Sequence, residues 1–238
     1  MDRFFTADFS GLKGSCIRWL VCLLLLLTAD ESFAAGHESS ASPEKVLFLT
    51  RLNQPLKQEW EHQKFTGETK YLLVSEDGKP AIQAAGQQSS SGLYKKIKYP
   101  LKAYPWLEWE WKLKIAHKTA DLRIKEKEDM ALGLFVIFSR PWLPWKTKSI
   151  AYVWTSAIHQ PGQLIMRPHH PYFVLQAGEE KKGRWIIERR NLYEDYKRAY
   201  GEYPAKDPKA IALFTDNDQT KEPAAGFYGS IKAIKKLP

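Results

Sequence analysis

The feature that most constrains the fold is an alternation of apolar and charged residues over nine positions, from Leu107 to Ile115. Every odd position in this segment is apolar and every even position is charged. Side chains of a β-strand point alternately to the two faces of a sheet, so the pattern predicts a strand with one face on a core and the other toward water. The charged face reads Glu, Glu, Lys, Lys and can pair with neighbouring strands.

Further strand-like segments follow one another from Val46 onward. Residues Ala131 to Phe138 are continuously apolar, which is typical of a central strand. Glu76-Asp77-Gly78-Lys79 carries the signal of a hairpin turn. The other predicted strands are Val46–Leu52, Thr69–Ser75, Ala81–Ala85, Gly92–Tyr99, Ile150–Ile158, Tyr172–Gln176, Arg184–Arg189, Ala210–Thr215 and Phe227–Ile234.

One helix is predicted, from Asn191 to Tyr200. Asn191 suits the N-cap, Leu192, Tyr196 and Tyr200 fall four residues apart on one face, and Gly201 suits the end of the helix. Many short strands with about one short helix predict a mainly β fold. We expect a single-domain β-sandwich of the jelly-roll type.

The N-terminal segment has the pattern of a secretory signal peptide. Trp19 to Ala29 contains no charged residue, Arg18 precedes this run, and Ser32-Phe33-Ala34 supplies a small-x-small cleavage site. We predict a signal peptide at 1–34, a linker at 35–44 and the β-sandwich domain at 45–238. The alternative is a buried N-terminal helix of a cytosolic protein.

Removal of such a peptide would leave a chain without thiols, because both cysteines, Cys16 and Cys22, lie within it. A thiol-free protein suits an oxidising compartment. The predicted location is therefore the periplasm or the cell exterior.

The charge balance favours anionic partners. The chain carries a net charge of +9, and removal of the predicted peptide, with its three basic and four acidic residues, raises this to +10. Such a charge favours acidic polysaccharide and peripheral contact with an anionic membrane surface. Nucleic acid is not expected as a partner in the periplasm. The alternative is that the lysines serve solubility alone.

No catalytic motif is recognisable in the sequence. It contains no Gly-x-Ser-x-Gly elbow, no phosphate-binding loop, no dinucleotide-binding glycine pattern and no HExxH. His169 and His170 adjoin, but neighbours in an extended segment point apart and rarely bind one metal. We therefore favour a protein that is not an enzyme. The competing hypothesis is a hydrolase using two carboxylates, drawn from Asp129, Asp195, Asp216 and Asp218.

Residues 215–220 concentrate oxygen-bearing side chains after an apolar strand. Asp216 and Asp218 are candidate metal ligands, and Thr220 is a candidate ligand-binding residue. Alternating oxygen ligands suit a structural calcium ion. The segment is not an EF-hand loop, because Lys221 replaces the required Gly and the closing Glu is absent. The alternative is a solvated turn in which these side chains bond their own backbone.

Two further sets of residues are candidates for ligand binding. Arg190 and Asp195 lie at the junction of a strand and the helix, where a bidentate pair would bind a polar ligand or anchor the helix. Trp142 and Trp145 lie in a loop stiffened by prolines and flanked by cations, which makes them candidate stacking platforms for a sugar ring or wedges into lipid head groups. The alternative is that they fold back over the end of the sandwich.

Several short motifs follow one another from about Val46 to Ile234. They are Phe65 to Tyr71, Ser91-Gly92-Leu93-Tyr94, Leu107 to Trp111, Tyr152-Val153-Trp154, Arg190 with Asp195, Tyr200-Gly201-Glu202, Thr215 to Thr220 and Tyr228-Gly229-Ser230-Ile231. Their order resembles a family of secreted bacterial proteins known as domain of unknown function 3047. The resemblance implies a fold similar to galactose-binding and carbohydrate-binding sandwiches, and it implies no activity. Where the family reads Gly-Asp-Asp, this chain has Lys127-Glu128-Asp129.

The leading hypothesis is a periplasmic or secreted β-sandwich that binds a glycan or another component of the cell envelope without turning it over. The hydrolase is the first alternative. The second is a structural protein whose sheet edge docks a partner during envelope assembly. The sequence does not define the oligomeric state.

Overall fold

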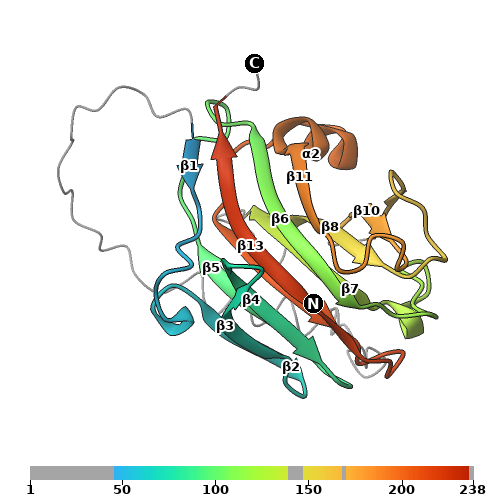
Figure 1. The fold of residues 1–238 in the computed structure, drawn as a ribbon. Coiled ribbons are helices and arrows are strands. Elements are labelled where there is room, and N and C mark those ends of the chain that lie inside the picture. The colour runs from blue at the N-terminus through green and yellow to red at the C-terminus, as the bar shows by residue number, and fades with distance from the viewer. Residues whose placement is uncertain (1–45, 139–146, 168–169, 236–238) are drawn as a thin grey trace, which may run out of the picture.

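The computed structural model describes residues 46–138, 147–167 and 170–235, which form two stacked β-sheets (Figure 1). The six-stranded sheet has the order β11 (Trp185–Asn191), β6 (Trp106–Ile115), β13 (Ala224–Ile234), β4 (Lys79–Gly86), β3 (Lys70–Glu76). Its sixth strand, β1 (Val46–Phe48), also pairs with β13. The seven-stranded sheet has the order β2 (Glu61–Thr66), β5 (Ser90–Lys96), β12 (Ala210–Asp216), β7 (Met130–Phe138), β8 (Lys148–Thr155), β10 (Tyr172–Ala177), β9 (Leu164–Ile165). The predicted mainly β sandwich is confirmed.

Helices contribute little to the described structure. The α-helix is α2 (Leu192–Tyr200), and two short 3₁₀ turns, η1 (Leu56–Gln58) and η2 (Lys125–Lys127), complete the set. The predicted caps of α2 are confirmed, because the Asn191 side chain accepts a hydrogen bond from the Glu194 N–H and Gly201 adopts a left-handed conformation with φ 73°. Among the described residues, no helix is long and apolar enough to cross a membrane.

The core between the sheets is built around tryptophan. Trp109 and Trp111 of β6 are almost fully buried, as their odd positions predict, and their rings meet edge to face at 5.5 Å between centroids. Tyr152 and Trp154 of β8 pack against them from the other sheet. Packed aromatic pairs of this kind add to the stabilisation that burial itself provides.

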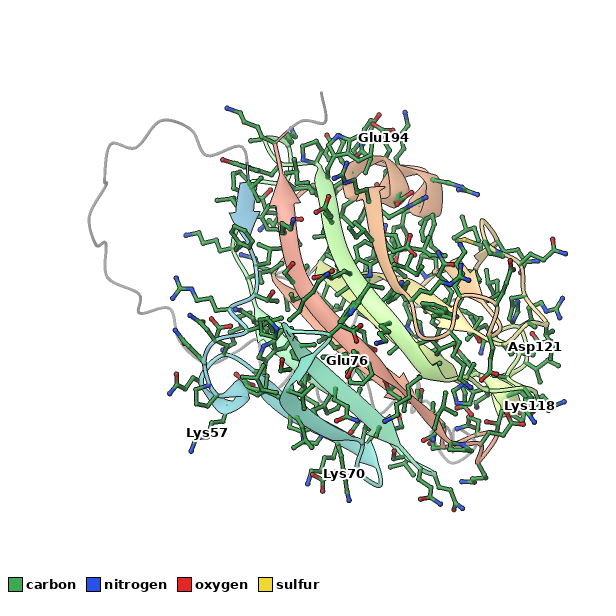
Figure 2. The ribbon with its side chains drawn as sticks, in the orientation of Figure 1. Lys57, Lys70, Glu76, Lys118, Asp121 and Glu194 are labelled. Carbon is green, nitrogen blue, oxygen red and sulfur yellow. The ribbon has the colours of Figure 1, made fainter. Side chains whose placement is uncertain are left out.

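The charged face of β6 pairs with its neighbours instead of meeting open water. Glu108 forms ion pairs with Arg189 of β11 and Lys232 of β13. Lys112 binds Glu76 and Asp77 of the β3–β4 hairpin, and Figure 2 shows Glu76 over the six-stranded sheet. The neighbouring side chains cover Glu108 and Lys112, so both count as buried although their ends are charged.

The predicted hairpin between β3 and β4 is confirmed, and two short strands were not predicted. Asp77 and Gly78 have φ values of 52° and 74°, the left-handed pair of a tight hairpin turn. The missed strands are β2 and β9. Strand β2 reads Glu-His-Gln-Lys-Phe-Thr and lacks an apolar pattern, and β9 is only two residues long. Trp185, at the start of β11, is half-buried.

The seven-stranded sheet has a second apolar face, turned away from the six-stranded sheet. We call the cluster of buried side chains on it the outer face: Tyr94, Leu122, Met130, Phe135, Ile137, Ala151, Val153, Tyr172, Val174, Ala210, Ala212 and Phe214. Among its described members, Leu122 alone lies outside the strands of the sheet. The sheet is thus apolar on both sides, although the other sheet covers one side only.

Candidate functional site

The candidate site lies where three neighbouring strands of the seven-stranded sheet end or begin. Asp216 is the last residue of β12, and in the ladders it stands opposite Ser90 of β5 and Met130 of β7. Asp129 directly precedes β7, and Asp218 follows β12 by two residues. Because β12 and β7 are antiparallel, the end of one and the start of the other meet at the same edge of the sheet.

A bulge in β7 sets the positions of these residues relative to one another. The ladder between β12 and β7 shifts between Phe214 and Asp216, so three steps of β7 oppose two steps of β12. Tyr228 from the facing sheet satisfies the disrupted ladder, since its hydroxyl accepts a hydrogen bond from the Gly133 N–H at 3.0 Å and donates one to the Phe214 carbonyl at 2.5 Å. The bulge therefore sets the register that brings Asp129 next to Asp216.

Three carboxylates meet at this point. One oxygen from each of Asp129, Asp216 and Asp218 lies within 4.8 Å of the other two. Their exposed fractions are 0%, 4% and 8% respectively. We call this group the carboxylate cluster.

The loop that follows β12 closes around Asp129. The Asp129 carboxylate accepts hydrogen bonds from the Gln219 N–H at 3.2 Å and from the Thr220 N–H and hydroxyl, both at 2.6 Å. Asn217 holds the other side, accepting from the Ser89 N–H and donating to the Glu222 carbonyl. Residues 216–220 are therefore ordered by contacts with two distant parts of the chain.

The electrostatics of the cluster are unfavourable as it stands. Burial raises the pKa of the Asp216 carboxyl well above its ordinary value, and the charges of Asp129 and Asp218 raise it further. Burial also raises the pKa of Asp129, although bonds from Thr220 and Gln219 act in the opposite direction. In the described part of the chain, no Lys, Arg or His forms an ion pair with any of the three.

Two polar atoms at the cluster lack a hydrogen-bond partner. They are Oδ1 of Asp216 and the hydroxyl oxygen of Ser90, and both are buried without a well-formed hydrogen bond, although the Ser90 hydroxyl is near enough to Asp216 to oppose the rise in its pKa. Buried polar groups are rarely left without a partner, so such atoms mark strain or a missing ligand.

The structure brings the sequence-predicted Asp216, Asp218 and Thr220 together, and it adds Asp129. Thr220 uses its hydroxyl to hold Asp129. Asp129 was considered only as a catalytic carboxylate, because it lies 87 positions before Asp216 in the sequence. The signal that could have found it is its place at the start of an apolar strand that can pair antiparallel with 210–215.

Arg190 and Asp195 lie elsewhere and bind each other. The Arg190 Nε and Nη2 donate to the two Asp195 oxygens at 2.8 and 2.5 Å, and the Tyr152 hydroxyl donates to Asp195 at 2.8 Å. Tyr152 faces the core between the sheets and pairs with Leu134 of β7. Leu134 lies four residues along β7 from Met130, the residue opposite Asp216, and four residues of a strand span about 13 Å. The pair anchors α2 and does not converge with the carboxylate cluster.

Trp142 and Trp145 lie outside the described residues, as does His169. His170 is described, is buried, and its Nε2 lies 2.9 Å from the Tyr172 hydroxyl. Tyr172 in turn donates to Glu128 at 2.9 Å. Glu128 also pairs with Arg167, so the residue before Asp129 belongs to a polar network at the rim of the outer face.

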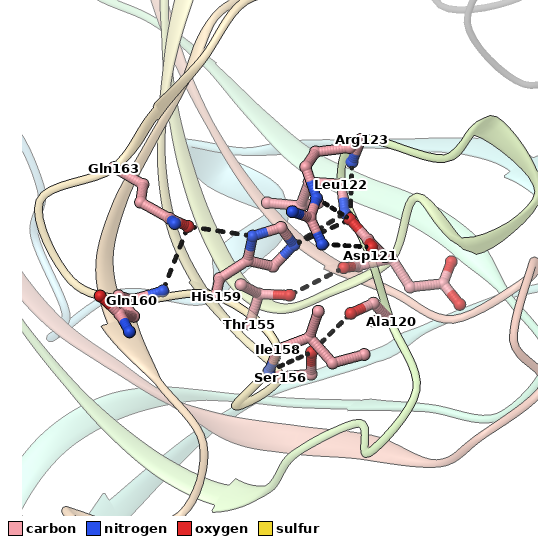
Figure 3. Close-up of polar contacts among 11 residues, drawn as sticks. Ala120, Asp121, Leu122, Arg123, Thr155, Ser156, Ile158, His159, Gln160 and Gln163 are labelled. Atoms are coloured by element: carbon pink, nitrogen blue, oxygen red, sulfur yellow. Dashed lines mark hydrogen bonds and ion pairs between the residues drawn. The ribbon is translucent and has the colours of Figure 1, made fainter.

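A strap formed by residues 116–129 connects β6 to the cluster and contributes Leu122 to the outer face. Figure 3 shows its attachment: the Ser156 hydroxyl donates to the Ala120 carbonyl, and Nε2 of His159 accepts from the Leu122 N–H at 3.0 Å. Nδ1 of His159 lies 3.2 Å from the Gln163 amide oxygen. Burial lowers the pKa of His159, which favours the neutral ring that this acceptor role requires.

Aromatic rings dominate the middle of the outer face. The rings of Phe135 and Phe214 meet at 4.9 Å between centroids, and Phe65 stacks on Phe214 at 6.1 Å. Gly92 of β5 makes room for this arrangement, since a Cβ there would lie 2.5 Å from two carbons of the Phe214 ring. The hydroxyl of Tyr94, on the same face, is buried without a hydrogen-bond partner.

The two apposed sheets with one helix at their end define the protein as a β-sandwich. The chain belongs to the family described as "Protein of unknown function (DUF3047)", whose model matches residues 58–232. No curated protein sequence matches it.

Solved structures that resemble the chain are sandwiches of low sequence identity. A family 11 carbohydrate-binding module from Clostridium thermocellum has a TM-score of 0.47 and 10% identity over 83% of this chain and 98% of its own. The same kind of module in complex with a β-1,3-1,4-mixed-linked tetrasaccharide has a TM-score of 0.44 and 11% identity, with 81% and 96% covered. A family 11 xylanase from Neocallimastix patriciarum has a TM-score of 0.35 and 8% identity, with 82% and 95% covered.

Proposed function

We propose that the protein binds a glycan of the cell envelope on the outer face of the seven-stranded sheet and does not turn it over. The observation that carries this proposal is the pairing of aromatic rings with the unpartnered Tyr94 hydroxyl on that face. The apolar side of a sugar ring stacks on aromatic side chains such as Phe214 and Phe135, and its hydroxyls need a polar partner such as Tyr94. The net charge of +9 favours an acidic glycan.

The side chains of the outer face are nearly inaccessible, with 4% exposure at Phe214 and 2% at Tyr94 and Tyr172. Binding therefore requires the cover of the face, to which Leu122 of the strap belongs, to move aside. The middle of the strap is held by the bonds of Ala120 to Ser156 and of Leu122 to His159, and a local opening that breaks them costs less free energy than opening the core between the sheets.

The arrangement of the carboxylates favours binding over hydrolysis. A glycosidase needs two carboxyl groups facing each other across an accessible cleft about 5–10 Å wide. Here Asp129, Asp216 and Asp218 are buried together, and Asp195 is engaged by Arg190. The purified protein should therefore release no reducing sugar from polymers that it binds.

The proposal is tested by binding of the full purified chain to a glycan array and to cell-wall polymers. Tyr94→Phe removes one hydroxyl and keeps the ring, so affinity should fall about tenfold, the value of one lost hydrogen bond to a ligand. Tyr99→Phe is the matched control, because the Tyr99 hydroxyl is also buried without a partner but faces the core between the sheets. Absence of binding by the folded wild-type protein contradicts the proposal, as does equal loss in both variants.

The location in the periplasm or cell exterior is part of the proposal and is tested separately. Fractionation of cells followed by mass spectrometry should find the chain outside the cytoplasm, beginning after Ala34. An intact N-terminus on cytosolic material contradicts it.

Docking of a partner on a sheet edge is the second candidate function. Strand β3 is an edge of the six-stranded sheet and exposes Leu72 by 57% and Leu73 by 36%. Exposed apolar residues on an edge strand can recruit another strand. Cross-linking in cells should then yield a defined protein adduct that Leu72→Lys abolishes, with glycan binding unchanged.

A further inference from the structure

The carboxylate cluster requires a positive partner that the described residues do not supply. Three ionised side chains would place a formal charge of −3 in a region that is at most 8% exposed. Taking one carboxylate out of water is costly, and like charges nearby add to the cost. The other buried acidic groups of the sandwich differ, because Asp195 has Arg190 and Glu108 has Arg189 and Lys232.

A second observation points to a ligand at the same place. Oδ1 of Asp216 and the Ser90 hydroxyl are both buried and lack partners, and the two residues stand opposite each other in the β5–β12 ladder. Both atoms are oxygen donors. A cation would use lone pairs on both of these oxygens.

We propose that Asp129, Asp216 and Asp218, with the Ser90 hydroxyl, bind a divalent cation, and that calcium is the ion that fits. Two ligands on opposite sides of calcium, at 2.3–2.6 Å each, lie about 4.6–5.2 Å apart. The carboxylate oxygens lie within 4.8 Å of one another, a spacing compatible with one ion between all three. An all-oxygen set drawn from a loop and two strand ends suits calcium, which tolerates irregular geometry better than magnesium does.

The bound ion would connect elements that are distant in the sequence. It would join the end of β12, the start of β7 and the first residue of β5, and it would hold the loop at 216–220 against Asp129. The unfolded chain does not form such a site, so binding stabilises the folded protein. This inference does not depend on the glycan proposal.

The test is thermal unfolding of the full chain, freed of metal with EDTA, in calcium chloride, in magnesium chloride and in sodium chloride of equal ionic strength. At a calcium concentration a hundred times the dissociation constant, Tm should rise by about 5–10 °C for a domain of this size. Magnesium should raise Tm less, and sodium should not raise it. Calorimetric titration should show about one calcium ion per chain.

Two variants identify the site. Asp216→Asn should remove the calcium-dependent rise in Tm, and Glu188→Gln should keep it. Glu188 is a matched control because it is a half-buried carboxyl, held by Gln176 and Trp111, on the other sheet. If Asp216→Asn fails to fold, Asp218→Asn replaces it, since Asp218 is the most exposed of the three.

The outcomes separate a cation from a shared proton. Equal Tm values with and without calcium overturn the inference and indicate that the carboxylates share protons. A calcium effect that survives in Asp216→Asn, or that disappears in Glu188→Gln, also overturns it. Glycan binding is measured in a different assay, so failure here leaves that proposal standing.

Discussion

The two ends of the sandwich use buried acidic residues in opposite ways. At the end that carries α2, one carboxylate, Asp195, meets the bidentate guanidinium of Arg190 and a tyrosine hydroxyl. At the end that carries the strap, three carboxylates meet with no described cation among them. Figure 2 shows these ends far apart, with Glu194 on the helix and Asp121 on the strap. A buried charge with its own partner needs no ligand, whereas a group of buried carboxyls without one must bind a cation or share protons.

The largest effect is expected from breaking the pair at the helix end. Asp195→Asn leaves the Arg190 guanidinium partly buried without its carboxylate, so unfolding free energy should fall by about 3 kcal/mol. Urea unfolding measures this, with Glu202→Gln as the control. Glu202 pairs with Lys148 at the surface, so this substitution should cost less than about 1 kcal/mol. Equal losses in both variants would mean that Arg190 and Asp195 do not anchor the helix.

Acid should weaken the strap end first. His117 in the strap is 2% exposed, neither ring nitrogen has a hydrogen-bond partner, and burial lowers its pKa to about 4. The unfolded chain, with a histidine pKa near 6.5, then binds more protons, so stability is complete above about pH 6.5 and falls as pH drops toward 4, by up to about 3 kcal/mol. Urea unfolding across this range should show the slope, and His117→Phe should flatten it. An unchanged slope in the variant would assign the acid sensitivity to other groups.

A smaller loss should follow from crowding the outer face, which begins next to the carboxylate cluster. In Gly92→Ala the new Cβ must displace the Phe214 ring, so stability should fall by about 2 kcal/mol and glycan affinity should fall as well. Gly183→Ala is the comparison, since φ there is 75° and no atom lies within 4 Å of the added carbon. That variant should lose stability through backbone strain alone, about 1 kcal/mol, and keep its affinity.

The smallest expected effect has the opposite sign. In protein freed of metal, Asp216→Asn removes one of three like charges and keeps the shape of the side chain, so stability should rise by about 1 kcal/mol. The same replacement, Asp to Asn, would then destabilise one end of the sandwich and stabilise the other. Urea unfolding in EDTA measures it, and a loss of stability similar to that of Asp195→Asn would remove the distinction between the two ends.

Much of the fold could be predicted from local patterns. The alternation at 107–115 placed Trp109 and Trp111 in the core, and the Asp77–Gly78 turn and both caps of α2 appeared where their residue types indicated. These features depend on side-chain period and on backbone preferences within a few residues. Strand β2 was not predicted because its sequence has no alternating pattern: its single Phe, Phe65, packs against the outer face, and the other residues are polar.

The candidate site was only partly predictable. Asp216, Asp218 and Thr220 are near neighbours in the sequence, so their common location follows from one turn. Asp129 joins them through the antiparallel register of β7 and β12 and the bulge that Tyr228 stabilises. Register depends on packing along whole strands, and a shift of one residue would have turned these side chains to the other face.

The sequence by itself determined that this chain forms amphipathic strands around a tryptophan core with one capped helix, because those properties are periodic or local. Tertiary structure alone decided which acidic residues meet. It gave Asp195 a guanidinium partner and left Asp216 facing two other carboxylates, since long-range pairing sets which charges share a buried space. Whether a charge is neutralised depends on neighbours within a few ångströms, and here those neighbours come from segments about ninety residues apart.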